Sequence, residues 1–244
     1  MRREGQLVVA LAVAMAACGA RRGDSSGPPI DAIVPRPDAV TAFAPLYAAN
    51  CAGCHGAEGR GGAALALADP VYLAIADDEA IRRVIRDGVS GTGMAPFAQS
   101  AGGMLTEHQV ESLVRGIRGW SNPAAVAGAT PPPRAHRGDG DVKRGARAYA
   151  TYCASCHGAS GRGGERASSI VDGSFLALVS DQYLRTIVIT GRRELGAPDW
   201  RGNVPGTPMT AEDVADVVAW LAAQRPAVPG QPYPAARAAI GERP

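Results

Sequence analysis

Lysine is almost absent from this sequence, and aromatic residues are scarce. Lys143 is the single lysine among 25 basic residues, and the formal net charge is only +2. No basic footprint for nucleic acid is therefore expected. Aromatic residues make up 5% of the chain, whereas it holds 31 glycines and 19 prolines. This composition favours loops wrapped over a bound group rather than a long β-sheet.

The sequence also lacks a long hydrophobic run and a pair of cysteines free to form a structural disulfide. The apolar stretch from Leu7 to Ala17 is shorter than the roughly 20 residues that span a bilayer. Because it follows Arg2 and Arg3, this stretch is typical of an export signal. Of the 5 cysteines, all but Cys18 lie in two repeated motifs.

The repeated motif is C-x-x-C-H, which occurs in the flanks CAGCHGAEGRGG and CASCHGASGRGG. It is the attachment sequence for c-type haem. Two cysteines three residues apart lie on one side of a helix and can both form thioethers to one porphyrin edge, while the histidine binds the iron. The predicted haem-binding residues are Cys51, Cys54 and His55 in the first copy and Cys153, Cys156 and His157 in the second.

Two other chemistries use C-x-x-C pairs. A single pair can be a redox dithiol or half of a zinc site, and the two pairs together can form one four-cysteine zinc site. The histidine after each second cysteine and the matching flanks favour haem.

On these motifs the chain resembles the class I cytochrome c family, and in particular its two-haem members. The resemblance implies an all-α fold of two tandem helical haem domains that hold two covalently bound haem c groups. The predicted segments are a signal peptide with a lipobox at 1–18, a flexible tether at 19–37, a first haem domain at 38–122, a Pro-rich linker at 123–138, a second haem domain at 139–226 and a tail at 227–244.

Each haem domain is expected to contain an entry helix, a middle helix and a last helix. In the first domain the middle helix spans 77–86 and ends at Gly88, and Thr106 caps the last helix. The apolar residues at helical spacing are Phe43, Leu46, Tyr47, Ile81, Val84, Ile85, Val110, Leu113, Val114 and Ile117.

The second domain repeats this plan. Gly191 ends its middle helix, Thr210 caps its last helix, and Gly145 in the entry helix is expected to allow close helix approach. The residues at helical spacing are Tyr149, Cys153, Tyr183, Leu184, Ile187, Val188, Val214, Val217, Val218 and Leu221.

A low-spin carrier needs a second axial ligand, and a methionine in that role raises the haem potential. In the first domain Met94, in Gly-Met-Ala-Pro-Phe, resembles the ligand loop of the family. Met104 is the rival, with a core filler as its alternative role. His108 and His136 are expected to be surface residues.

The second domain departs from this pattern. Six residues after the helix-ending glycine, Ala197 stands where the first domain has Met94. Met209, which aligns with Leu105, is the only methionine beyond His157. We expect Met209 to be either the iron ligand or a core residue at a helix start, and the iron-ligand role is slightly favoured.

The sequence Met15-Ala16-Ala17-Cys18 resembles a bacterial lipobox, although a leucine usually stands in place of Met15. It predicts a lipid anchor on Cys18 and a location on the periplasmic side of a bacterial membrane. The alternative is ordinary signal cleavage nearby.

The family resemblance implies an electron carrier rather than an enzyme. Its expected partners are redox proteins: a quinol-oxidising complex or dehydrogenase on one side and a terminal oxidase on the other. Two alternatives remain open at this point. One is a cytochrome subunit permanently docked to a dehydrogenase, and the other is a peroxidase-like or gas-sensing protein in which the second haem is open.

Overall fold

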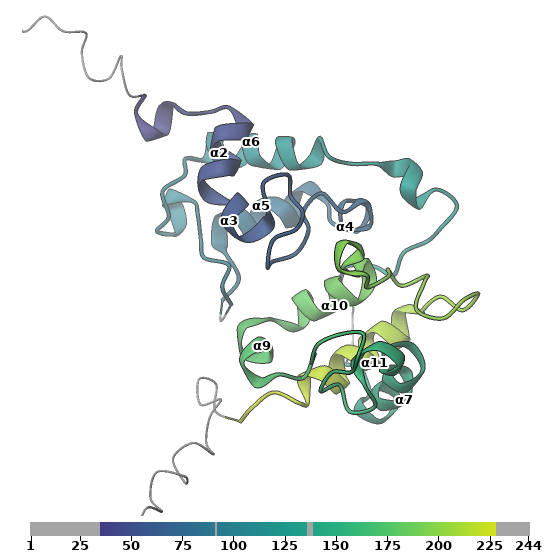
Figure 1. Ribbon diagram of the computed structural model, residues 1–244. Helices are drawn as coiled ribbons and strands as arrows, with labels where there is room; N and C mark the ends of the chain where they lie inside the picture. Colours follow the sequence, from purple (N-terminus) through teal and green to yellow (C-terminus); the bar gives the residue numbers. More distant parts are fainter. Residues whose placement is uncertain (1–34, 91, 136–138, 228–244) are drawn as a thin grey trace, which may run out of the picture. The chain divides into compact units, whose positions relative to one another are not determined.

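The computed structural model describes residues 35–90, 92–135 and 139–227 (Figure 1). These residues form helices joined by loops, and the only β pairing among them is a set of isolated bridges. The predicted all-α fold is therefore confirmed. The predicted signal peptide, Cys18, most of the predicted tether, His136 and the predicted tail after Ala227 lie outside the described residues.

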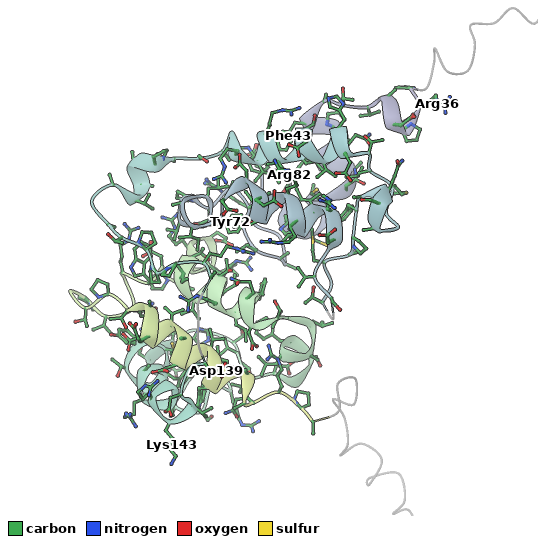
Figure 2. All side chains as sticks on the ribbon, turned by 180° about the vertical axis from the view of Figure 1, so that it is seen from behind. Arg36, Phe43, Tyr72, Arg82, Asp139 and Lys143 are labelled. Atoms are coloured by element: carbon green, nitrogen blue, oxygen red, sulfur yellow. The ribbon has the colours of Figure 1, made fainter. Side chains whose placement is uncertain are left out.

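The first module contains two 3-10 helices and five α-helices, followed by a 3-10 helix. In order they are η1 Pro37–Ala39, α2 Phe43–Asn50, α3 Ala52–His55, α4 Pro70–Ile75, α5 Asp78–Asp87, η2 Gln99–Ala101, α6 Glu107–Arg118 and η3 Pro123–Val126. The second module contains α7 Val142–Tyr152, α8 Ala154–His157, α9 Gly173–Leu178, α10 Asp181–Thr190, η4 Arg193–Leu195 and α11 Ala211–Ala222. Lys143 lies exposed on α7 (Figure 2).

The predicted helix ends are confirmed because they depend on local chemistry. Thr106 and Thr210 each form a capping box, in which the threonine side chain and the side chain three residues later satisfy each other's backbone N–H groups. Gly88 and Gly191 end the middle helices with φ of 66° and 67°, a conformation that suits glycine.

The sequence reasoning missed two short helices, α4 and α9. The side chain of Asp69 caps α4 by accepting the N–H groups of Val71 and Tyr72, and Asp172 caps α9 in the same way. Six residues are too few for a helical apolar period, so only the capping aspartates could have signalled these helices.

Each module has its own apolar core. In the first, the predicted inward stripe of α6 is buried at Val110, Leu113, Val114 and Ile117. In the second, the stripe of α11 is buried at Val214, Val217, Val218 and Leu221. Val84, expected on the buried face of α5, is only half-buried, unlike its neighbours Ile81 and Ile85.

The first and last helices of each module pack closely at a glycine. On α6 of the first module, a Cβ at Gly116 would lie 2.0 Å from the ring of Phe43 on α2 (Figure 2). On α7 of the second, a Cβ at Gly145 would lie 2.0 Å from the carbonyl oxygen of Asp216. The close approach expected at Gly145 is therefore confirmed.

Residues of the first module and the segment after it also contact the second module. Val71 of α4 is fully buried in the second core cluster, and Val126 and Ala129 pack against that cluster. Arg193 forms an ion pair of 2.8 Å with Asp69. The stretch predicted as a linker therefore supplies apolar contacts as well as a connection.

Candidate haem sites

The first C-x-x-C-H motif straddles two helices. Cys51 ends α2, and its carbonyl oxygen accepts the N–H of His55 at 3.0 Å, which starts the short helix α3. The turn carries both cysteines and the histidine within five residues. Cys51 is buried and Cys54 is exposed, and neither forms a disulfide.

A hydrogen bond sets the tautomer of His55. Its Nδ1 lies 2.7 Å from the carbonyl oxygen of Leu65. Because a carbonyl oxygen can only accept, Nδ1 carries the proton and Nε2 keeps the lone pair that binds iron. Metal-ligating histidines are oriented by this kind of bond.

The second motif has the same geometry. Cys153 ends α7, its carbonyl oxygen accepts the N–H of His157 at 3.0 Å, and α8 follows. The Nδ1 of His157 lies 2.8 Å from the carbonyl oxygen of Ser168. Both histidines are therefore held ready to bind metal through Nε2.

A tyrosine on the entry helix of each module is hydrogen-bonded to the glycine that follows the motif. The hydroxyl of Tyr47 donates to the carbonyl oxygen of Gly56 at 2.9 Å, and that of Tyr149 donates to Gly158 at 2.5 Å. Gly56 has φ of 84°, and a Cβ there would lie 1.7 Å from the carbonyl oxygen of Arg60. The glycine after each histidine thus lets the loop fold back over the motif.

Burial shifts the pKa values of three motif side chains, Cys51, Cys153 and His55, towards their neutral forms. It raises the pKa of the Cys51 thiol to about 11 and that of Cys153 to about 12, with the neighbouring motif cysteine adding to each shift. Burial also lowers the pKa of His55, and the bond to Leu65 opposes this shift. A neutral imidazole at His55 is the form that binds iron.

The predicted sixth ligand of the first module, Met94, lies on the loop after α5. Its carbonyl oxygen accepts the N–H of Val89 at 2.8 Å, and its side chain is half-buried. The rival Met104 is 78% exposed, so its predicted alternative role as a core filler is wrong. It stands in the turn between η2 and α6, on the solvent side of the chain. His108 is exposed, as expected.

The structure places Ala197 at the position of Met94. Its carbonyl oxygen accepts the N–H of Arg192 at 3.0 Å, as Met94 does from Val89. Met209 lies elsewhere, in the core of the second module, and is 3% exposed. Its role as an iron ligand stays a prediction.

The sequence reasoning missed the backbone partners of the two histidines and the arginine beside Ala197. Leu65 and Ser168 lie 10 and 11 residues from their histidines, and their carbonyl groups leave no sequence signal. The Arg192 guanidinium donates to the carbonyl oxygen of Gly62 at 2.7 Å, three residues before Leu65.

No group of three or more His, Cys, Asp or Glu side chains in the part of the chain that the structure describes is arranged to hold a metal ion. No helix among the described residues is both long enough and apolar enough to cross a membrane.

Comparison with known proteins gives a family match and curated relatives from cbb3-type oxidases. The family described as "Cytochrome C oxidase, cbb3-type, subunit III" matches residues 38–115 and 140–221. The cbb3-type cytochrome c oxidase subunit CcoP of Azospirillum sp. (strain B510) is 32% identical over 125 residues, which cover 47% of this chain and 38% of that protein. Subunit FixP of Azorhizobium caulinodans is 29% identical over 171 residues, which cover 68% of this chain and 54% of that protein.

Among solved structures, the KustC0563 c-type cytochrome is 30% identical with a TM-score of 0.30, over 33% of this chain and 99% of that one. The matched part of the chain spans about half the length, or less, of the curated relatives named above. The family match covers more than half of this chain, and each matched segment contains one C-x-x-C-H motif. The chain therefore belongs to the cbb3-type cytochrome c oxidase subunit III family and carries two covalently bound c-type haems.

Proposed function

We propose that this chain is an exported, lipid-anchored dihaem cytochrome that relays electrons between respiratory proteins and has no catalytic reaction of its own. The observation that carries the proposal is the duplicated unit of two cysteines and a histidine, with each histidine Nδ1 bonded to a backbone carbonyl oxygen. Haem iron bound there supplies reversible one-electron transfer. The described residues hold, orient and cover that group.

The individual residues have separate tasks in this proposal. Cys51, Cys54, Cys153 and Cys156 anchor the porphyrins, and His55 and His157 bind the two irons. Met94 is the proposed sixth ligand in the first module, where its sulfur would raise the potential. The carbonyl groups of Leu65 and Ser168 keep the histidines from rotating, and the two tyrosines hold the glycine that follows each histidine.

The names of the relatives support a terminal oxidase as the electron acceptor, because both named relatives are subunits of cbb3-type cytochrome c oxidases. A quinol-oxidising complex or a dehydrogenase is the proposed donor. Copurification distinguishes a permanent contact from a transient one. A permanent subunit stays with the oxidase through detergent extraction, whereas a mobile carrier is lost.

The membrane anchor is proposed on Cys18, from the lipobox-like sequence that ends there. Lipidation at that cysteine would tie the haem modules to the membrane through the tether. One acyl group gives weak binding, so several chains on one cysteine are needed for stable anchoring.

Two variants measured with two readouts test the proposal. Cys18→Ser should release the protein from membranes while both haems stay attached. Cys153→Ala with Cys156→Ala should stay on membranes and keep a single haem that survives denaturing gels. Mass spectrometry of the intact chain counts the haems, and fractionation locates the protein. Haem that extracts freely from the wild-type chain, or a mature N-terminus without lipid, would contradict the corresponding half of the proposal.

A further inference from the structure

The loops that follow the middle helices can be compared atom by atom. In both modules the N–H of the residue after the helix-ending glycine donates to a carbonyl oxygen five residues further on, that of Met94 or of Ala197. A Cβ built on Gly88 would touch the carbonyl oxygen of Met94 at 2.6 Å, and one on Gly191 would touch that of Ala197 at the same distance. The two loops therefore share one register from the glycine to this carbonyl group, and Ala197 brings a methyl group to the place of the thioether.

Met209 occupies the place of a different residue. Its N–H donates to the carbonyl oxygen of Trp200 at 2.9 Å, just as that of Leu105 donates to Phe97 at 2.7 Å. Met209 directly precedes the cap of α11, and Leu105 directly precedes the cap of α6.

The surroundings of Met209 match its register. Met209 is 3% exposed and Leu105 is 4% exposed, and each belongs to the core cluster of its module. The side-chain amide of Asn203 lies 3.8 Å from the sulfur of Met209 and uses it as a weak acceptor. Met209 therefore does the packing task of a leucine, and moving its sulfur to an iron would empty part of the core.

The rest of the second module offers no other side chain of the kinds that commonly bind haem iron as a sixth ligand. Beyond His157 the sequence contains no further histidine, no cysteine and no lysine. Lys143, at the start of α7, is exposed.

From this comparison we propose that the second haem is open on the side of Ala197 and binds a small neutral diatomic ligand when its iron is ferrous. The first haem, with Met94 in the same loop position, excludes such a ligand. The inference depends on haem attachment in the second module and is independent of the redox partner.

Carbon monoxide is the probe, and the test uses the full haem-loaded protein. Reduced wild-type protein should bind a single equivalent of carbon monoxide for its two haems, measured by optical titration. Ala197→Met should lose most of this binding, and Met94→Ala should add a second equivalent. The second haem should also have the lower midpoint potential, and Ala197→Met should raise it, because thioether ligation raises the potential.

Met209→Leu is the matched control, because leucine already occupies the equivalent place in the first module. It should fold and leave both carbon monoxide binding and the near-infrared sulfur-ligation band unchanged. A wild-type protein that binds no carbon monoxide would overturn the proposal. If Met209→Leu then gained an equivalent, Met209 would be the ligand. A haem count of two per chain keeps this outcome separate from a failure of haem attachment.

Discussion

In both haem modules the first and last helices cross where a glycine faces a large aromatic residue. The two modules place the glycine and the aromatic residue on opposite helices. In the first, Phe43 on α2 fills the space left by Gly116 on α6. In the second, the glycine is on α7 at position 145, and the large residue, Trp220, is on α11. Counted from the C-x-x-C-H motifs and from the capping threonines, these are equivalent positions.

This exchange shows that the helix crossing constrains the combined volume of the two facing side chains rather than the volume of either one. Interiors are close-packed, so a large residue on one helix is matched by a small one on its neighbour. The tryptophan that packs against the tyrosine also differs between the two modules. Trp120 meets Tyr47 edge-on with ring centroids 5.0 Å apart, whereas Trp220 stacks on Tyr149 at 4.2 Å.

An arginine at the end of the last helix, or just after it, shows a similar compensation. Arg118 donates to the carbonyl oxygens of Leu73 and Ala76 at the end of α4. In the second module Arg225 donates to the equivalent carbonyl oxygens, at the end of α9, although it comes about one helical turn later in the sequence. The same carbonyl groups are satisfied from two different sequence positions.

The largest expected effect concerns the two glycines. Gly145→Ala should lower the free energy of unfolding by about 3 kcal/mol or more, because its Cβ would meet backbone atoms that cannot rotate away. Gly116→Ala should cost less, because its Cβ would meet the Phe43 ring. Phe43→Ala should rescue Gly116→Ala in a double-mutant cycle, with a coupling of roughly 1 kcal/mol or more. Denaturant unfolding of the haem-loaded protein compares the three single variants and the double variant with the wild type. Equal costs at both glycines, with no rescue, would contradict this account of the crossing.

A second prediction concerns an arginine on the middle helix that is paired with carboxylates in the first module, whereas its counterpart forms no ion pair within the described part of the second. Arg82 on α5 donates to Glu111 at 3.1 Å and to Glu79 at 2.6 Å (Figure 2). The equivalent Arg185 is buried, and its Nε donates to the carbonyl oxygen of Pro133 at 3.0 Å. Within the described residues, its two terminal nitrogens are buried without a hydrogen-bond partner.

Arg185→Met should therefore leave the melting temperature unchanged or raise it, whereas Arg82→Met should lower it. Removing Arg185 relieves the desolvation cost of its two unpaired nitrogens and loses one bond to Pro133, whereas removing Arg82 leaves Glu79 and Glu111 without their cation. Calorimetry of the two variants, each with both haems attached, compares them. The expected difference is lost if both substitutions destabilise equally.

The smallest effect is expected at high pH. Burial raises the pKa of Tyr47 to about 12 from its ordinary value of 10.0. Above pH 10 the unfolded chain releases this proton while the folded chain keeps it, so the stability contributed below pH 10 is lost as the pH rises towards 12. Tyr47→Phe should remove this part of the alkaline loss and also cost about 1 kcal/mol at neutral pH, through the lost bond to Gly56.

Tyr149→Phe is the matched variant in the second module, where burial also raises the pKa of the phenol. Unfolding measured at several pH values between neutral and strongly alkaline compares both variants with the wild type. If neither substitution reduced the loss of stability that the wild type shows at alkaline pH, that loss would come from other groups.

Local chemistry made much of this protein predictable from its sequence. The C-x-x-C-H motifs, the capping boxes at Thr106 and Thr210 and the glycines that end α5 and α10 act within a few residues of chain. The α6 and α11 stripes follow from helical periodicity. The departure at Ala197 was also visible, because Met94 and Ala197 each stand six residues after the glycine that ends the middle helix.

Only the tertiary structure decided the features that join distant residues. The carbonyl groups of Leu65 and Ser168 that orient the histidines belong to the backbone, so any side chain there would serve. The burial of Met209 in the place of Leu105 follows from a register that connects α11 to the loop before it. The exchange of large and small residues between helices depends on a shared volume, which no single position in the sequence specifies.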